Sequence, residues 1–253
     1  MDAITVMAGT DKAGHPEKFD SIELRMGRMY AIVGNTGSGK SRFVKDVEQL
    51  SAGDSPTRRR VLVDGRQLGY QERSEFERSS IAHVGQNIRF VLDVTVEEFV
   101  AMHARCRGRV PCIDDVVALA NEITPEHVRR ESKLNVLSGG QSRALMVADV
   151  ALVCDSPIVL VDEIENAGID KVAALSALCR ADKLVLAVTH DPHTALMAHE
   201  RIVMKGGSVA CVRARSEREK EAFVSLDGQY RRQRALQQAL REGGEVAWAE
   251  CAR

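Results

Sequence analysis

Short apolar runs separated by polar turns predict the strands of this chain. Three of them, "AITVM", "SIEL" and "MYAIV", lie within residues 3 to 33. A fourth run in "RRRVLVDGRQL" meets a turn at Asp64 and Gly65. Further strands are expected at "IAHVG", "PIVLVDE" and "KLVLAV", and "RIVMKGGSVACV" predicts a closing hairpin through Gly206 and Gly207.

Between these strands, apolar residues recur at helical spacing. A helix is expected in "KSRFVKDVEQL", and another from a Thr95 cap through an acidic first turn to about Arg107. The pattern also predicts a polar helical stretch over 111 to 135, broken at Pro125, and helices in "SRALMVADVALVC" and "DKVAALSALCR". Beyond Arg213 the chain becomes rich in charge and glutamine, which indicates a helical appendage. Strands and helices together predict an α/β fold.

Composition adds only broad limits. The chain has 253 residues, 44% of them hydrophobic and 28% charged, as in ordinary globular proteins. A net charge of −1 gives no reason to expect a nucleic-acid partner. No span approaches ~18 apolar residues, and the start lacks a secretory pattern, so we expect a cytoplasmic protein. The six cysteines lack metal-ligand spacing and are expected to be reduced thiols.

One glycine-rich segment between a predicted strand and a predicted helix carries specific chemistry. It fits the pattern of glycine, four residues, glycine, lysine, then serine or threonine. Its residues are Gly34, Asn35, Thr36, Gly37, Ser38, Gly39, Lys40 and Ser41. In this setting backbone N–H groups and a helix N-terminus can bind phosphates, Lys40 can reach the β and γ phosphates, and the Ser41 hydroxyl can bind Mg²⁺. The segment therefore predicts a nucleotide-binding loop.

Further motifs follow in a fixed order. They are Gln86 in "VGQN", the "LSGGQ" segment of Leu137, Ser138, Gly139, Gly140 and Gln141, the carboxylates Asp162 and Glu163 after "IVLV", "AGID" ending at Asp170, and His190. With this set the chain resembles the ATP-binding cassette (ABC) ATPases over about residues 3 to 212. The resemblance implies a P-loop NTPase core with an antiparallel β subdomain and a small helical signature subdomain at about 95–150. It implies an ATPase domain at 1–212 and a charged helical tail at 213–253.

The resemblance also implies roles for these residues, with ATP and Mg²⁺ as ligands. Ser41, Gln86 and Asp162 would bind the metal, and Glu163, His190 and Gln86 would serve catalysis. Two carboxylates at a strand's C-terminal end face the crevice where such sheets bind ligands, so Glu163 can act as general base there. Ser138 to Gln141 would begin a helix and contact the nucleotide of a second subunit, as would Asp170, so hydrolysis would need a dimer.

The chain also departs from the family pattern. Ile164 follows the glutamate where proline is usual, and "DEIENAGID" is one residue longer than expected. Asp149 stands where arginine is common. An aromatic residue that stacks on adenine is expected near 10 to 15, where only His15 is planar. These differences indicate an unusual subfamily that keeps every phosphate and metal ligand.

Two functions are open at this stage. The first is the energy-coupling subunit of a membrane transporter, held at the inner face of the plasma membrane by a permease that docks near residues 86 to 135. The second is a soluble ABC ATPase that acts on a protein or cofactor-maturation partner. The tail at 213–253 has three possibilities: a helix docked on its own domain through Phe223, Leu226 and Tyr230, a partner-binding helix, or a disordered segment.

Overall fold

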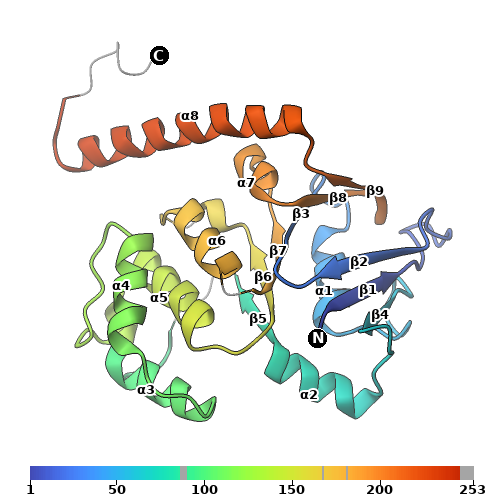
Figure 1. The fold of residues 1–253 in the computed structure, drawn as a ribbon, viewed down its shortest axis with the longest axis horizontal. Coiled ribbons are helices and arrows are strands. Elements are labelled where there is room, and N and C mark those ends of the chain that lie inside the picture. Colours follow the sequence, from blue (N-terminus) through green and yellow to red (C-terminus); the bar gives the residue numbers. More distant parts are fainter. Residues whose placement is uncertain (86–89, 167, 181, 246–253) are drawn as a thin grey trace.

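The computed structural model describes residues 1–85, 90–166, 168–180 and 182–245, so the proposed Gln86 lies outside it. In these residues the strands form an antiparallel sheet of order β2-β1-β4 and a larger sheet of order β5-β6-β7-β3-β8-β9 (Figure 1). The strands are β1 (Ala3–Met7), β2 (Ser21–Arg25), β3 (Met29–Val33), β4 (Arg60–Val63), β5 (Ile81–Val84), β6 (Ile158–Asp162), β7 (Leu184–Val188), β8 (Glu200–Lys205) and β9 (Ser208–Ala214). Each predicted strand is confirmed, and β8 and β9 form the predicted hairpin.

The helices differ from the pattern in two ways: the stretch predicted to be helical after Pro125 holds only a 3₁₀ turn at Leu134–Val136, and the helices at 70–80 and 192–197 were not predicted. The helices are α1 (Lys40–Glu48), α2 (Tyr70–Ser80), α3 (Val96–Cys106), α4 (Ile113–Ile123), α5 (Gly139–Leu152), α6 (Lys171–Arg180), α7 (Pro192–Met197) and α8 (Glu217–Arg241). The Thr95 hydroxyl caps α3 by accepting a bond from Glu98 N–H, and α4 ends before Pro125, as predicted. Helix α2 was not expected. Its surface is polar and largely exposed, so no apolar stripe marks it in the sequence.

The large sheet lies between two hydrophobic cores. Strands β5 to β8 run parallel, and the interior strands β6 and β7 are apolar on both faces, as expected of a parallel sheet covered by helices. Alternate residues point to opposite faces, so Val159 and Val185 join one core while Leu160 and Leu186 join the other. The first core is shared with α3 to α6, and the second with α1 and the antiparallel sheet. Helices α1 and α5 therefore pack on opposite faces of the sheet.

A buried ion cluster joins the antiparallel sheet to α1. The Arg59 guanidinium bonds to Glu17 Oε1 at 2.6 Å and to Asp46 Oδ2 at 3.1 Å, and these side chains have 0–1% exposure. Burial would raise the pKa of Glu17, but the Arg59 hydrogen bonds and the N–H groups of Gly9 and Val209 hold it below its usual value. The cluster compensates the desolvated charges with short, directed bonds.

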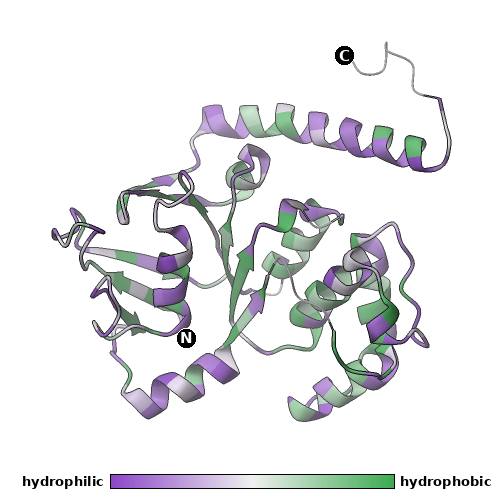
Figure 2. Cartoon of the chain, turned by 180° about the vertical axis from the view of Figure 1, so that it is seen from behind, coloured by the Kyte–Doolittle hydropathy of each residue, from purple (hydrophilic) through white to green (hydrophobic). Residues whose placement is uncertain are grey.

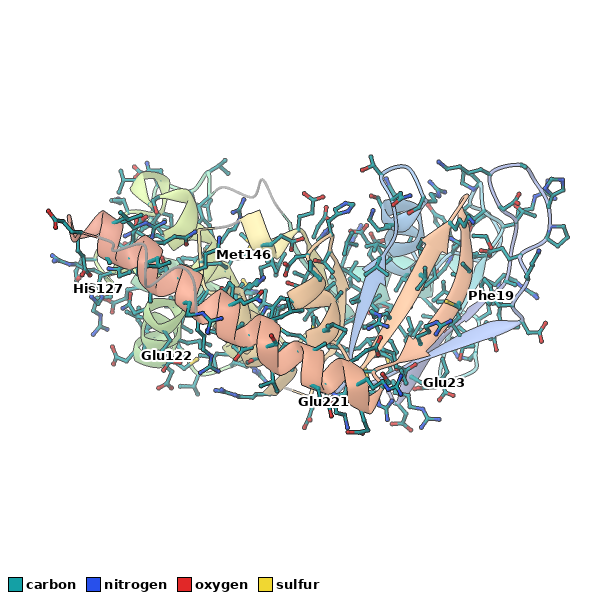
Figure 3. All side chains as sticks on the ribbon, turned by 90° about the horizontal axis from the view of Figure 1, so that it is seen from above. Phe19, Glu23, Glu122, His127, Met146 and Glu221 are labelled. Atoms are coloured by element: carbon teal, nitrogen blue, oxygen red, sulfur yellow. The ribbon has the colours of Figure 1, made fainter. Side chains whose placement is uncertain are left out.

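Helix α8 lies along one edge of the molecule beside α7 in Figure 1 and is mostly hydrophilic in Figure 2. Figure 3 shows it crossing the molecule from Glu221 toward the end where His127 lies. The Ser216 side chain caps it by accepting from Glu219 N–H at 3.4 Å. No helix in the described ranges combines the length and apolar character that a membrane span requires. The division at residue 212 stays a prediction, and β9 ends two residues beyond it.

Candidate nucleotide-binding and hydrolysis site

The phosphate loop joins the end of β3 to the start of α1. Gly39, at the N-cap of α1, has φ +105° and gives the helix no side-chain cap. In α5, by contrast, the Ser138 side chain caps the helix. The first N–H groups of α1 therefore face a loop rather than a capping side chain. This is the arrangement that binds an anion at a helix N-terminus.

Close packing fixes the glycines of this loop. A Cβ at Gly34 would lie 2.4 Å from the Met204 carbonyl oxygen, and one at Gly39 would lie 2.9 Å from Gly207 Cα. Gly207 N–H donates to the Ser38 carbonyl at 2.9 Å, so the turn between β8 and β9 supports the loop. Arg59 Nη2 donates to the Gly207 carbonyl at 2.8 Å. The buried ion cluster is thus linked to the phosphate loop through one backbone turn.

Two lysines attach to the loop. Lys40 is 7% exposed, and its Nζ donates to the carbonyls of Gly34 and Asn35 at 2.7 and 3.3 Å. Lys12 Nζ donates to the Gly37 carbonyl at 2.5 Å. The buried Ser38 Oγ has no hydrogen-bond partner within the described residues. A bound triphosphate fits this set of groups: the glycine loop, the uncapped start of α1, the Lys40 ammonium and the Ser38 hydroxyl.

The two strand-end carboxylates differ in backbone conformation. Asp162 ends β6, and Glu163 follows with φ +48°, a left-handed conformation that costs a non-glycine residue roughly 1–2 kcal/mol. Glu163 N–H donates to the Val188 carbonyl at 3.1 Å, which ties this residue to the end of β7. Backbone strain of this kind often accompanies a functional site. Ser41 and Asp162 offer the oxygen ligands that Mg²⁺ prefers.

His190 lies next to Glu163 at the end of β7. Its Nε2 is 3.7 Å from Glu163 Oε1, an ion-pair distance for a protonated imidazole. The backbone N–H of His190 donates to Glu165 Oε1 at 3.2 Å, and the same oxygen accepts from the Thr189 hydroxyl at 2.9 Å. Glu165, in the segment that is one residue longer than the family pattern, thus fixes the backbone that carries His190. No motif in the sequence singles out Glu165.

A cavity of about 530 Å³ opens beside the phosphate loop and His190. Gly34, Asn35 and His190 line one side, and an Arg201–Glu219 ion pair with a 2.5 Å contact closes the other. The hydrogen bond from Arg201 is the main reason that the pKa of Glu219 falls to about 2. Glu219 belongs to the first turn of α8, so the tail borders the site.

The "LSGGQ" segment begins α5 on the other side of the sheet. Ser138 Oγ accepts from Gln141 N–H at 3.2 Å, and Gln141 Oε1 accepts from Ser138 N–H at 2.9 Å. Gln141 Nε2 also donates to the His127 carbonyl. This capping box gives the Gln141 side chain a local structural role, while the Ser138 hydroxyl hydrogen stays available to a ligand. A Cβ at Gly139 would meet nothing within 4 Å, so the helix start is open there.

Asp170 directly precedes α6 and is held from two directions. Its Oδ1 accepts from the N–H groups of Val172 and Ala173 at 2.9 and 3.1 Å, which caps the helix. On the other side it pairs with Arg234 of α8. The expected nucleotide contact of Asp170 stays a prediction.

Comparison with known proteins identifies this arrangement. The model of the ABC transporter family matches residues 18–166. The chain belongs to the ABC transporter family of ATPases. An uncharacterised ABC transporter ATP-binding protein of Methanocaldococcus jannaschii is 48% identical over 220 residues, which cover 86% of this chain and 84% of that protein. The resemblance inferred from the motifs is confirmed.

A second relative joins the ABC ATPase to a permease. The macrolide export ATP-binding/permease protein MacB of Campylobacter jejuni is 27% identical over 75% of this chain, which spans only 30% of MacB. An ATP-binding cassette solved as a dimer with ADP and Pi after hydrolysis has a TM-score of 0.60 and 24% identity, over 83% of this chain and 98% of that chain. That likeness confirms the α/β fold class with its antiparallel sheet.

Proposed function

We propose that this ABC ATPase powers a membrane transporter as a head-to-tail homodimer, in which each signature segment covers the ATP bound to the partner's phosphate loop. The separation of α1 and α5 by the sheet carries the proposal. One chain cannot close its own signature over its own phosphate loop across that layer, whereas a second copy can present Ser138 and Gly139 there. The cassette that this fold resembles was solved as a dimer, which supports an assembly of two copies.

Within each site we assign roles by chemistry and position. Lys40 and the loop N–H groups bind the phosphates, and Glu163 accepts the proton of the attacking water. His190 donates a hydrogen bond to the γ-phosphate. Mg²⁺, when bound through Ser41, Asp162 and Gln86, would offset the charge of the phosphates. Asp170 completes the contact between subunits.

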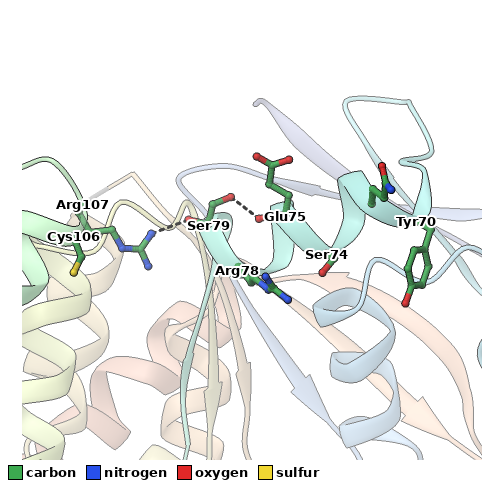
Figure 4. A pocket seen from close by; sticks show the side chains of 8 residues that line it. Tyr70, Ser74, Glu75, Arg78, Ser79, Cys106 and Arg107 are labelled. Atoms are coloured by element: carbon green, nitrogen blue, oxygen red, sulfur yellow. Dashed lines mark hydrogen bonds between the residues drawn. The ribbon is translucent and has the colours of Figure 1, made fainter.

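A groove between α2 and α3 is a suitable place for the membrane partner. It encloses about 630 Å³ and is lined by Tyr70, Gln71, Ser74, Glu75, Arg78, Ser79, Cys106 and Arg107 (Figure 4). Arg107, just after α3, donates to the carbonyl of Ser79 in α2 at 3.1 Å, which links the two sides of the groove. Tyr70 lines the groove and is 82% exposed, and its ring centroid lies 5.9 Å from the Arg73 guanidinium carbon.

We infer that a cytoplasmic segment of an integral-membrane permease fills this groove and holds the ATPase at the inner face of the plasma membrane. MacB supports this because it unites an ATP-binding part and a permease in one protein. With a net charge of −1 and no extended basic run, nucleic acid is not a proposed partner.

Copurification from detergent-solubilised membranes tests this function. We expect the tagged chain to retain an integral-membrane protein, and Ser74→Arg, which fills the groove, to lose it while still binding ATP. Val224→Arg on the exposed surface of α8 is the matched control and should keep the partner. Recovery of a soluble partner alone would favour the second function, an ATPase that acts on a soluble protein.

A further inference from the structure

Helix α8 is attached to the body by a stack of three rings. His193 of α7 lies between Phe223 and Tyr230, with ring centroids 5.0 Å away on each side and interplanar angles of 13° and 20°. Asp227, between them on the same helix face, has its Oδ1 3.2 Å from His193 Nε2. Two aromatic stacks and one polar contact hold α8 at α7, three residues after His190.

Tyr230 reaches beyond this stack. Its hydroxyl accepts from Lys171 N–H at 3.3 Å and donates to Asp170 Oδ1 at 3.4 Å. The Lys171 ammonium lies 4.5 Å from the centroid of its ring, within cation–π range. Phe223, the other ring of the stack, lies under Arg215 instead, with 5.6 Å between the Arg215 guanidinium carbon and the ring centroid. The two rings hold His193 alike but differ in what else they touch.

Lys171 in turn connects to the segment that carries His190. Its Nζ is 2.5 Å from Asp191 Oδ2, and Lys171 is 7% exposed. Asp191 caps α7 by accepting from Thr194 N–H and Oγ1 at 2.8 and 2.7 Å. Burial acts to raise the pKa of Asp191, but the bonds from Lys171 and Thr194 lower it overall, so the carboxylate is ionised. The path runs from Tyr230 through Lys171 to Asp191, the neighbour of His190.

We propose that Tyr230 is a positioning residue for ATP hydrolysis: by covering the Lys171–Asp191 ion pair and contacting Asp170, it holds the subunit-contact segment and the His190 segment in one fixed geometry. The inference rests on the proposed roles of His190 and Asp170. Excluding water from one face strengthens the ion pair, because the interaction grows as the local dielectric falls. The tail is thereby part of the catalytic apparatus, although it contributes no group to the reacting atoms.

Matched substitutions in the full chain separate positioning from docking. Tyr230→Leu and Phe223→Leu each remove one ring from His193, but only the first uncovers Lys171. We expect Tyr230→Leu to lower kcat about fivefold, the equivalent of roughly 1 kcal/mol in the barrier, with KM for ATP unchanged. Phe223→Leu should stay within about twofold of the parent. Tyr230→Phe, which keeps the ring over Lys171 but loses the hydroxyl bonds to Asp170 and Lys171 N–H, should restore part of the rate.

A double-mutant cycle supplies the second readout. If Tyr230 acts through Lys171, then Tyr230→Leu should add no further loss in a Lys171→Met background. Should the Tyr230→Leu chain not fold, Lys171→Met alone should show the same fall in kcat at constant KM. Equal losses in the two leucine variants, or a parental kcat in Tyr230→Leu, would overturn the inference. Glu163→Gln, run in parallel, reports on the proposed function: if it stays active, the site assignment fails, whatever Tyr230 does.

Discussion

Glu163 Oε1 and His190 Nε2 lie 3.7 Å apart at the ends of two adjacent parallel strands. Neither side chain could be placed by its own strand alone. Glu163 adopts a left-handed backbone conformation and bonds to Val188, and Glu165 holds the His190 N–H. The pair is thus held by backbone contacts from both strands, which suits a base that accepts a proton from water and a histidine that contacts phosphate.

The first prediction concerns Glu163→Gln. The amide keeps the size and hydrogen bonding of the side chain but cannot accept the proton, so ATP hydrolysis should fall by at least about 10²-fold. ATP affinity should be retained, because the phosphate loop is untouched. Phosphate release and equilibrium ATP binding measure the two quantities, and Glu217→Gln on the exposed start of α8 is the control. A Glu163→Gln chain as fast as the parent would place the base elsewhere.

The second prediction concerns Lys40→Ala. The change removes the buried ammonium that bonds to the loop carbonyls of Gly34 and Asn35 and is proposed to bind phosphate. A hydrogen bond to a charged group contributes about 1.5–3 kcal/mol, so affinity for ATP should fall at least about tenfold. Lys45→Ala, on the exposed side of the same helix, should bind ATP normally. Undiminished binding by Lys40→Ala would contradict the phosphate-loop assignment.

The third prediction concerns stability. Arg59→Met leaves the buried carboxylates of Glu17 and Asp46 without their cation, which should lower the free energy of unfolding by about 3–5 kcal/mol. Arg25→Met breaks an ion pair with Glu23 whose side chains are 61% and 51% exposed. An exposed pair contributes at most about 1 kcal/mol, so this control should change little. Urea unfolding measures the free energy of unfolding of both variants. Equal losses would show that the buried cluster stabilises the fold no more than an exposed ion pair does.

The fourth prediction concerns pH. Burial and the Lys171 ammonium lower the pKa of His193, outweighing Asp227 and Asp191, which act to raise it. Above pH ~6.5 the imidazole is neutral whether α8 is docked or free. Below that pH the freed imidazole takes up a proton more readily, so docking should weaken as pH falls from ~6.5 toward the lowered pKa. Asp191 and Glu219 do not titrate in this window, because their pKa values are also lowered.

Hydrogen-exchange protection factors of α8, corrected for intrinsic rates, measure this docking at pH 7.5 and 5.5. His193→Phe keeps a stacked ring but does not titrate, so its α8 protection should be the same at both values. A parent chain with equal protection at both pH values would contradict the prediction. A phenylalanine variant that still loses protection in acid would trace the effect to another group.

Local patterns in the sequence predicted much of this molecule. The phosphate loop and "LSGGQ" are continuous segments. The apolar residues that flank them recur at helix or strand spacing, so their positions at helix starts follow from neighbouring residues. Helix α2 escaped prediction because its exposed, polar sequence has no apolar stripe. The docking of α8 was one of three open readings. Phe223 and Tyr230 were recognised as a stripe, but their partner His193 lies 30 residues before Phe223 and 37 before Tyr230 in sequence.

Glu165 and Lys171 were missed for a related reason. Each acts through a partner that is distant in the chain, Glu165 through Thr189 and Lys171 through Asp191. Spacing within one segment cannot reveal such pairs. The longer segment after Glu163 was noticed as a departure from the family pattern, and this was the available signal that its residues make contacts of their own.

Complementation between two inactive variants tests the composite site most directly. Ser138→Arg should block the signature while sparing ATP binding by its own phosphate loop, and Lys40→Ala should do the reverse. In a mixed dimer one site carries both changes and the other is intact, so ATP hydrolysis should return on mixing. Adding Glu163→Gln to the Ser138→Arg chain should abolish the recovered activity, whereas adding it to the Lys40→Ala chain should not. If mixed dimers form but stay inactive, or if Ser138→Arg alone destroys ATP binding, the head-to-tail account is wrong.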